Sequence, residues 1–207
     1  MFPPELVSEI EPGTNLLVSG PAMSGKRELL LQLLARGAPD DEGAIVVTSR
    51  NPGADVAEEF SSMIDDQDTF FRVIDCLGSE SEFDFVHSVS SPGDLTGIGI
   101  EFSELAREAN EREVDRIRIG FDSLSPLLMY VDLQRLFRFL HVFTSQIQSR
   151  DWLGLFAIDP DAHDEQVVNT ISQLFDGMIE VRVADEGGRE ARIRGITSSP
   201  TEWVPLD

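Results

Sequence analysis

One loop near the N-terminus carries the clearest chemical signature in this 207-residue chain. It fits the phosphate-binding pattern G-x-x-x-x-G-K and consists of Gly20, Pro21, Ala22, Met23, Ser24, Gly25, Lys26 and Arg27. Glycines let the backbone turn its N–H groups toward an anion, a helix N-terminus adds partial positive charge, and the lysine reaches the outer phosphates. The alternative is a glycine turn between a strand and a helix. Because Lys26 is the only lysine among 16 Lys and Arg residues, its place in the pattern favours a loop that holds the phosphates of a nucleotide.

The residue after the lysine departs from this pattern. A Ser or Thr hydroxyl normally binds Mg²⁺ there, whereas the guanidinium of Arg27 has no acceptor atom and repels a metal ion. Ser24 supplies another hydroxyl, but it is poorly placed for the same task. We therefore expect the nucleotide to bind, leave Mg²⁺ open as a cofactor, and expect metal-assisted hydrolysis to be impaired.

A second acidic site follows an apolar run. Ile117 to Phe121 has the composition of a buried strand, and Asp122 ends it. This order is typical of a Walker B element, whose Asp helps to hold Mg²⁺. Asp is also a good helix N-cap, so a capping role is the alternative. With a phosphate loop upstream, we favour Asp122 as a nucleotide-site residue and as the metal-binding carboxylate.

Short apolar runs alternate with amphipathic segments along the chain, an order that predicts an α/β fold with a mostly parallel central sheet between two helical layers. Strands are predicted at 15–19, 44–48, 70–74, 83–89, 117–121 and 152–158. Helices are predicted at 26–35, 54–64, 102–113, 133–148 and 165–175. Segments 178–184 and 190–196 predict an antiparallel C-terminal hairpin that turns at Gly187 and Gly188. We expect the run of helix breakers at 90–99 to be a functional surface loop, and residues 1–207 to form a single domain.

Three further segments carry a family resemblance. Residues 121–128, which read FDSLSPLL, resemble the D-S-L/I-S-x-L segment of KaiC-like and RadA-like ATPases. FDGMIEV at 175–181 resembles their A-D-G-V-I-x-L strand, and RIRG at 192–195 resembles their K-x-R-G strand. The order and spacing agree across nearly the whole chain, so the domain resembles the RecA/KaiC core. The composition and the segment 91–99 resemble the branch of this superfamily found in salt-loving archaea.

The resemblance implies a three-layer RecA-like P-loop domain that binds ATP. It also implies assembly into a ring or filament with nucleotide at subunit interfaces, where Arg192 and Arg194 would face a neighbour's γ-phosphate. An exposed arginine pair on an edge strand is an equal alternative for these two residues. In the family, an acidic residue after the second core strand activates the attacking water. Here the segment 48–51 reads TSRN, without a carboxylate.

The charge balance restricts the partners and the location of the protein. Asp and Glu number 38 against 16 Lys and Arg, which gives a formal net charge of −22. At molar salt the Debye length is only about 3 Å, so a salt-rich cytoplasm tolerates such a surface. We therefore expect a halophilic, cytoplasmic protein, and the single Cys76 agrees with that compartment. As for nucleic acid, a recombinase-like DNA partner ranks last among the possible functions, because the sequence has no basic stripe and only 16 Lys and Arg residues. No apolar run reaches the ~18 residues of a membrane span.

Three functions remain open on the sequence alone. The first is an ATP-binding, KaiC-like regulatory switch with weak or absent hydrolysis, with a signalling partner or further copies of the chain as its target. The second is an active ATPase with a displaced catalytic acid, for which Asp55, Glu58 and Glu59 are the candidates. The third is a non-enzymatic signalling or scaffold module on a degenerate ATPase fold.

Overall fold

The computed structural model describes residues 10–65, 68–184, 187–196 and 200–206. The ends of the expected domain, residues 1–9 and 207, lie outside this range. The described strands form one nine-stranded sheet in the order β4-β3-β2-β5-β6-β1-β7-β8-β9. These strands are β1 (Asn15–Ser19), β2 (Gly43–Thr48), β3 (Phe71–Asp75), β4 (Val86–Ser88), β5 (Ile117–Phe121), β6 (Leu153–Ile158), β7 (Gly177–Val183), β8 (Arg189–Arg194) and β9 (Val204–Pro205).

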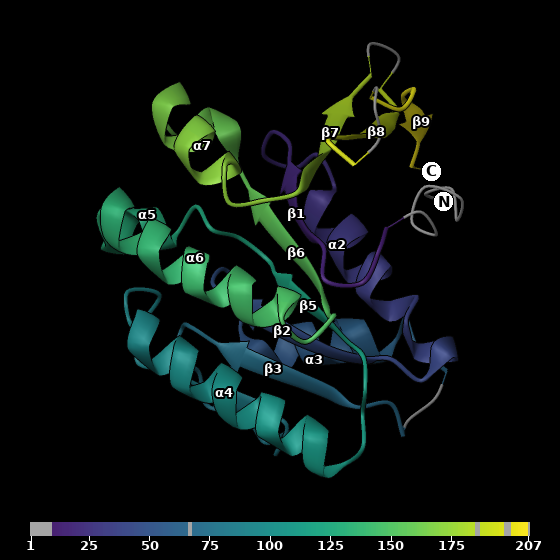
Figure 1. The fold of residues 1–207 in the computed structure, drawn as a ribbon, viewed down its shortest axis with the longest axis vertical. Coiled ribbons are helices and arrows are strands. Elements are labelled where there is room, and N and C mark those ends of the chain that lie inside the picture. Colours follow the sequence, from purple (N-terminus) through teal and green to yellow (C-terminus); the bar gives the residue numbers. More distant parts are fainter. Residues whose placement is uncertain (1–9, 66–67, 185–186, 197–199, 207) are drawn as a thin grey trace.

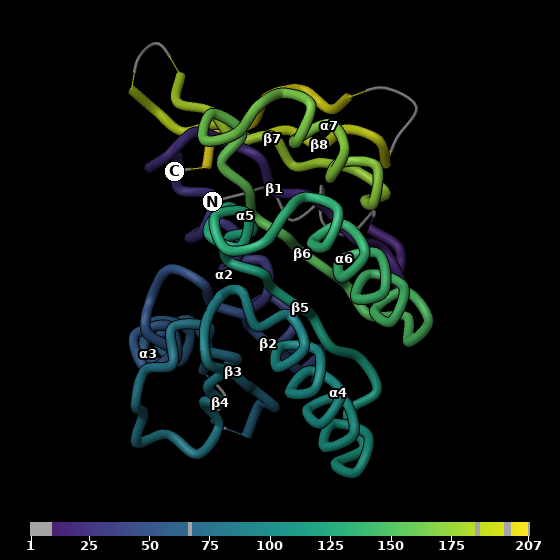
Figure 2. Tube along the Cα trace, turned by 90° about the vertical axis from the view of Figure 1, so that its left-hand side faces the viewer, coloured from purple at the N-terminus to yellow at the C-terminus, as the bar shows by residue number. Residues whose placement is uncertain are grey.

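Helices connect the strands and cover both faces of the sheet. The α-helices are α2 (Lys26–Ala35), α3 (Gly53–Ser61), α4 (Leu95–Glu111), α5 (Leu127–Tyr130), α6 (Leu133–Gln148) and α7 (Glu165–Ser172), with short 3₁₀ turns η1 (Ala38–Asp40) and η2 (Pro160–Ala162). Helices α4, α6 and α7 lie on the front face of the sheet in Figure 1, and α2 and α3 lie behind it. Turned by 90°, Figure 2 shows β2, β3 and β4 between α3 and α4. In the described part of the chain, no helix is long and apolar enough to cross a membrane.

Alternation along the buried strands separates two hydrophobic cores. In β1, Leu16 and Val18 pack with the leucines of α2, whereas Leu17 packs with the cluster that α4 and α6 share. The strands from β4 to β7 pair in parallel, and β8 and β9 add antiparallel pairs at one edge. The predicted three-layer α/β architecture is confirmed, and so is the C-terminal hairpin. Gly187, with φ +88°, supplies the left-handed residue that its turn requires.

The predicted surface loop at 90–99 is wrong in its second half. Helix α4 begins at Leu95, well before the expected start at Phe102. The Asp94 side chain accepts a hydrogen bond from the Gly97 N–H at 2.8 Å and so caps this first turn. Leu95 and Ile98 are buried in the core, and this burial offsets the low helix propensity of the two glycines at 97 and 99.

Helix α2 is the element that presents the phosphate loop, and its leucines anchor it. Leu30 is fully buried and packs above Gly120 of β5, where a Cβ would come within 2.8 Å of its Cδ2 atom. We expect Leu30→Ala to lower the free energy of unfolding by about 2–5 kcal/mol, because the cavity can close only partly. Gln32→Ala on the same helix is the control and should change it by about 0.5 kcal/mol at most. Urea denaturation of both variants measures the difference, and equal effects would contradict this packing.

Candidate nucleotide-binding site

Four parallel strands bring the predicted site residues to one edge of the sheet. Strands β2, β5, β6 and β1 are successive neighbours, so their carboxyl ends meet at the same edge. The phosphate loop follows β1, Asp122 follows β5, and the segment 48–51 lies at the end of β2. Asp159 follows β6, and in the sheet β6 lies between β5 and β1, the strands that carry the two predicted motifs. The structure thus joins the loop and Asp122, which are far apart in the sequence.

Both glycines of the loop have a structural reason to be there. Gly25 has φ +81° and is the N-cap of α2, a conformation that a side chain would strain. At Gly20, a Cβ would lie 2.7 Å from the Val181 carbonyl oxygen of β7. The loop between them exposes Met23 almost completely, with φ +61°. The two glycines are therefore explained by the turn from strand to helix alone. The evidence for an anion-binding site is the position of Lys26.

Lys26 is buried and faces a carboxylate at the end of the neighbouring strand. Its Nζ atom forms a salt bridge with Asp159 Oδ1 and donates to the Pro21 carbonyl oxygen at 3.0 Å. Asp159 also accepts from Arg50 Nη1 at 3.2 Å, and its own N–H donates to Ser125 Oγ at 3.0 Å. An isolated buried ammonium is costly, so Asp159 compensates the charge of Lys26 within the protein. A phosphate that binds Lys26 has to compete with this carboxylate.

Asp122 is almost fully buried in a nest of donors. The Thr48 hydroxyl donates to its Oδ2 atom at 2.8 Å, and the Ser49 N–H donates to Oδ1 at 3.0 Å. Burial raises the pKa of Asp122 above its ordinary value, and the bonds from Ser49 and Thr48 and the charge of Arg27 oppose that rise. The protein therefore resists the ionised form that a metal ligand requires.

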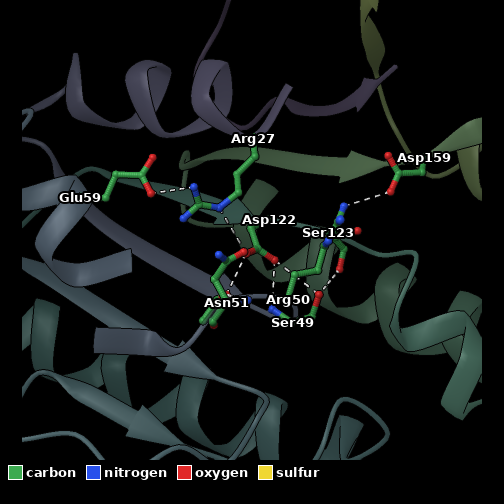
Figure 3. A network of polar contacts seen from close by, with 9 residues as sticks. Arg27, Ser49, Arg50, Asn51, Glu59, Asp122, Ser123 and Asp159 are labelled. Atoms are coloured by element: carbon green, nitrogen blue, oxygen red, sulfur yellow. Dashed lines mark hydrogen bonds and ion pairs between the residues drawn. The ribbon is translucent and has the colours of Figure 1, made fainter. Parts of the chain in front are cut away.

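Arg27 reaches from the first turn of α2 into this acidic corner, as Figure 3 shows. Its Nη1 atom donates to Glu59 Oε2 at 2.6 Å, and its Nε atom lies 3.8 Å from Asp122 Oδ2. Its Nε and Nη2 atoms are buried, and neither has a hydrogen-bond partner among the described residues. The guanidinium is thus the cation that lies next to the predicted metal-binding carboxylate.

These residues do not fit a Mg²⁺ ion. Mg²⁺ needs oxygen ligands in near-octahedral geometry, and the guanidinium of Arg27 stands beside Asp122 where such ligands are expected. Both oxygens of Asp122 already accept protein hydrogen bonds. Among the residues that the structure describes, no three His, Cys, Asp or Glu side chains gather as a metal-binding group. The described side chains around Asp122 therefore do not offer the ligand set that Mg²⁺ requires.

Arg192 and Arg194 lie on β8 and bind a carboxylate of their own chain. Arg192 Nε donates to Glu180 Oε2 at 2.5 Å, and Arg194 Nη1 donates to Glu180 Oε1 at 2.6 Å. The Arg192 guanidinium also stacks 4.5 Å from the ring centroid of Trp203. Glu180 is paired with Ser19 at the end of β1. Glu180 therefore links the two arginines to the strand that leads into the phosphate loop. Their role toward a neighbouring subunit stays a prediction.

Two residues of the site were not assigned these positions from the sequence. Asp159 ends an apolar strand in the same way as Asp122, and this was the signal available for it. Glu59 was a candidate for a displaced catalytic acid, but in the structure its carboxylate forms a salt bridge with Arg27. Of the other candidate acids, Asp55 and Glu58 are exposed on α3.

Comparison with known proteins agrees with this architecture. A family model, DUF7504, described as a family of unknown function, matches residues 13–181. The chain belongs to the DUF7504 family. This match spans the phosphate loop, Asp122 and Asp159, and ends before Arg192 and Arg194. No curated protein matches the chain.

One solved structure extends the comparison of this DUF7504 chain to its fold. A KaiC-like protein from the hyperthermophilic archaeon Pyrococcus horikoshii matches with a TM-score of 0.69 and 15% identity. The match covers 95% of this chain and 86% of that one. At this identity the likeness shows the fold, and the predicted RecA-like, KaiC-like architecture is confirmed.

The buried carboxyl of Asp122 predicts a pH dependence of stability in the DUF7504 chain. Burial holds the pKa of Asp122 in the folded protein above the ordinary value of an aspartate. Between these two values, the folded state therefore holds a proton that the unfolded state releases. Stability is therefore lost as the pH rises from about 4 through the folded-state pKa. Asp122→Asn cannot titrate, so its unfolding free energy should gain on that of the wild type over the same range.

Thermal or urea melts of both proteins from pH 4 to 7 measure this difference. Asp161→Asn, at an exposed position of the same end of the sheet, controls for the loss of one carboxylate. If the wild type instead gained stability relative to Asp122→Asn as the pH rose, the raised pKa of Asp122 would be contradicted.

Proposed function

We propose that this protein binds ATP as a regulatory element and hydrolyses it weakly or not at all. The observation that carries the proposal is the placement of Lys26. The only lysine of the chain lies at the start of α2, in a phosphate-binding loop, at the edge where parallel strands of α/β proteins bind ligands. The first N–H groups of a helix lack intrahelical partners and favour an anion at the same point.

The surroundings of the loop favour holding a nucleotide over cleaving it. Fast phosphoryl transfer needs a group that orients or activates water and a metal that stabilises the developing charge. Arg27 lies beside Asp122, the predicted metal ligand. Arg50 lies in the segment where the family resemblance implies a water-activating acid. Both are cations with no acceptor atom, so neither can take over the work of a base.

The displaced-acid alternative receives less support from the contacts. Glu59 is the one candidate acid that reaches the site, and Arg27 binds it at 2.6 Å. To act as a base, Glu59 would first have to leave this ion pair. Phosphate release that Asp122→Ala abolishes would nevertheless restore this alternative.

The context of the function remains part of the proposal. The net charge of −22 with one lysine agrees with a salt-rich cytoplasm, and we place the protein there and in the halophilic branch. A regulatory protein needs a partner that distinguishes its nucleotide-bound form from its free form. We propose that a signalling protein or further copies of this chain, in a ring or filament, provide it, with Arg192 and Arg194 at the contact.

The function predicts that ATP affinity depends on Lys26. In molar KCl, Lys26→Ala should weaken ATP binding about tenfold or more, because a charge-assisted hydrogen bond to phosphate contributes roughly 1.5–3 kcal/mol. Isothermal titration calorimetry measures this loss. Arg107→Ala removes one positive charge from an exposed position of α4 and should leave the affinity unchanged. No binding of ATP or ADP by the wild type, or equal binding by Lys26→Ala, would refute the proposal.

A further inference from the structure

We infer that Arg27 is a built-in cation that replaces Mg²⁺ at this site, so that the protein binds nucleotide without a divalent metal. The inference rests on the proposed function, since it presupposes a nucleotide in the phosphate loop. It goes beyond that function by assigning the form of the ligand, which is a metal-free nucleoside triphosphate. Arg27 becomes a phosphate-binding residue with this role.

The position of Arg27 is the first support. It follows Lys26 directly, at the start of α2, where the phosphate-binding pattern has the metal-binding hydroxyl. Its guanidinium lies between the carboxylates of Glu59, at 2.6 Å, and Asp122, at 3.8 Å (Figure 3). A positive charge thus occupies the corner between the loop and the end of β5, which is where the motif calls for the metal.

The unused donors of Arg27 are the second and independent support. Its Nε and Nη2 atoms are buried without a hydrogen-bond partner among the described residues. A buried charged donor left without an acceptor is destabilising and needs an explanation. Phosphate oxygens match the planar fork of a guanidinium, which can donate two parallel bonds to them. The side chain as a whole is 25% exposed, whereas Nε and Nη2 are covered, so a phosphate has to displace their neighbours to accept bonds from them.

The charges around the loop are the third support. Mg²⁺ normally neutralises a carboxylate and the phosphates together. Here three cations meet three carboxylates in close pairs: Lys26 and Arg50 with Asp159, and Arg27 with Glu59 and Asp122. The incoming phosphates therefore meet a corner whose carboxylates the protein has already neutralised, in spite of the strongly acidic chain.

Paired titrations of the wild-type protein test the inference directly. ATP is titrated into the full chain in molar KCl, once with EDTA and once with excess MgCl₂. We expect the two dissociation constants to agree within about threefold. Binding that weakens about tenfold or more in EDTA would overturn the metal-free site while leaving the proposed function intact. No binding in either buffer would overturn both.

A substitution that restores the pattern should restore the metal requirement. Arg27→Thr supplies the hydroxyl and removes the guanidinium, so we expect ATP affinity in EDTA to fall about tenfold or more and to recover partly in MgCl₂. Arg107→Thr, an exposed arginine on α4, is the matched control and should behave as the wild type in both buffers. Unchanged affinity of Arg27→Thr in EDTA would overturn the role of Arg27. Should Arg27→Thr fail to fold, as judged by circular dichroism, the wild-type pair of titrations still decides the question.

Discussion

The contact of Arg27 with Asp122 and Glu59 determines what kind of site the phosphate loop can form. The carboxylate of Asp122 is buried, which makes its charged form costly. The bonds that it accepts from Thr48 and Ser49 and the nearby charge of Arg27 reduce this cost. In this fold the cation comes from the protein, through a side chain that begins next to Lys26. The same side chain binds the carboxylate of Glu59 and so draws α2 and α3 together at the end of the sheet.

A second ion-pair group completes the corner. Lys26 and Arg50 both form salt bridges with Asp159, the residue that directly follows β6. These opposite charges pair with one another and hold the loop and the strand ends in one geometry. Under the proposed function, a phosphate of ATP would take the place of the Asp159 carboxylate as the partner of Lys26. Such an exchange would suit a switch, because binding would change the partners of charges at the start of α2 and after β2 and β6 at once. It would suit rapid turnover less, because the carboxylates of Asp159, Glu59 and Asp122 each have a cation as their partner.

The sequence predicted the fold well wherever the apolar period was regular. Helices α2 and α6 and strands β1 and β5 begin and end at the predicted residues, since leucine-rich stripes, caps and breakers coincide there. Helix α4 was predicted to start too late because Gly97 and Gly99 resemble loop residues, whereas the Asp94 cap and the burial of Ile98 keep them helical. A local pattern cannot weigh burial against propensity when the burial comes from strands far along the chain.

The site was predictable in its parts but not in its pairings. The phosphate loop and Asp122 followed from short motifs, and the departure at Arg27 was visible in the sequence. The partners of Arg27 and Lys26 were not, because they depend on which strand lies beside β1 and on how α3 packs against β3. The same holds for Arg192 and Arg194, which meet Glu180 only through the register of β7 and β8.

The central claim is that this site holds ATP without consuming it, and the chemical state of bound nucleotide tests that claim most directly. The protein is loaded with ATP in molar KCl with MgCl₂, freed of excess nucleotide, and sampled over hours, and the nucleotide released by denaturation is separated by ion-exchange chromatography. The account predicts that the bound nucleotide remains ATP throughout. Conversion of the bound ATP to ADP within minutes, at a rate that Asp122→Ala abolishes, would contradict it.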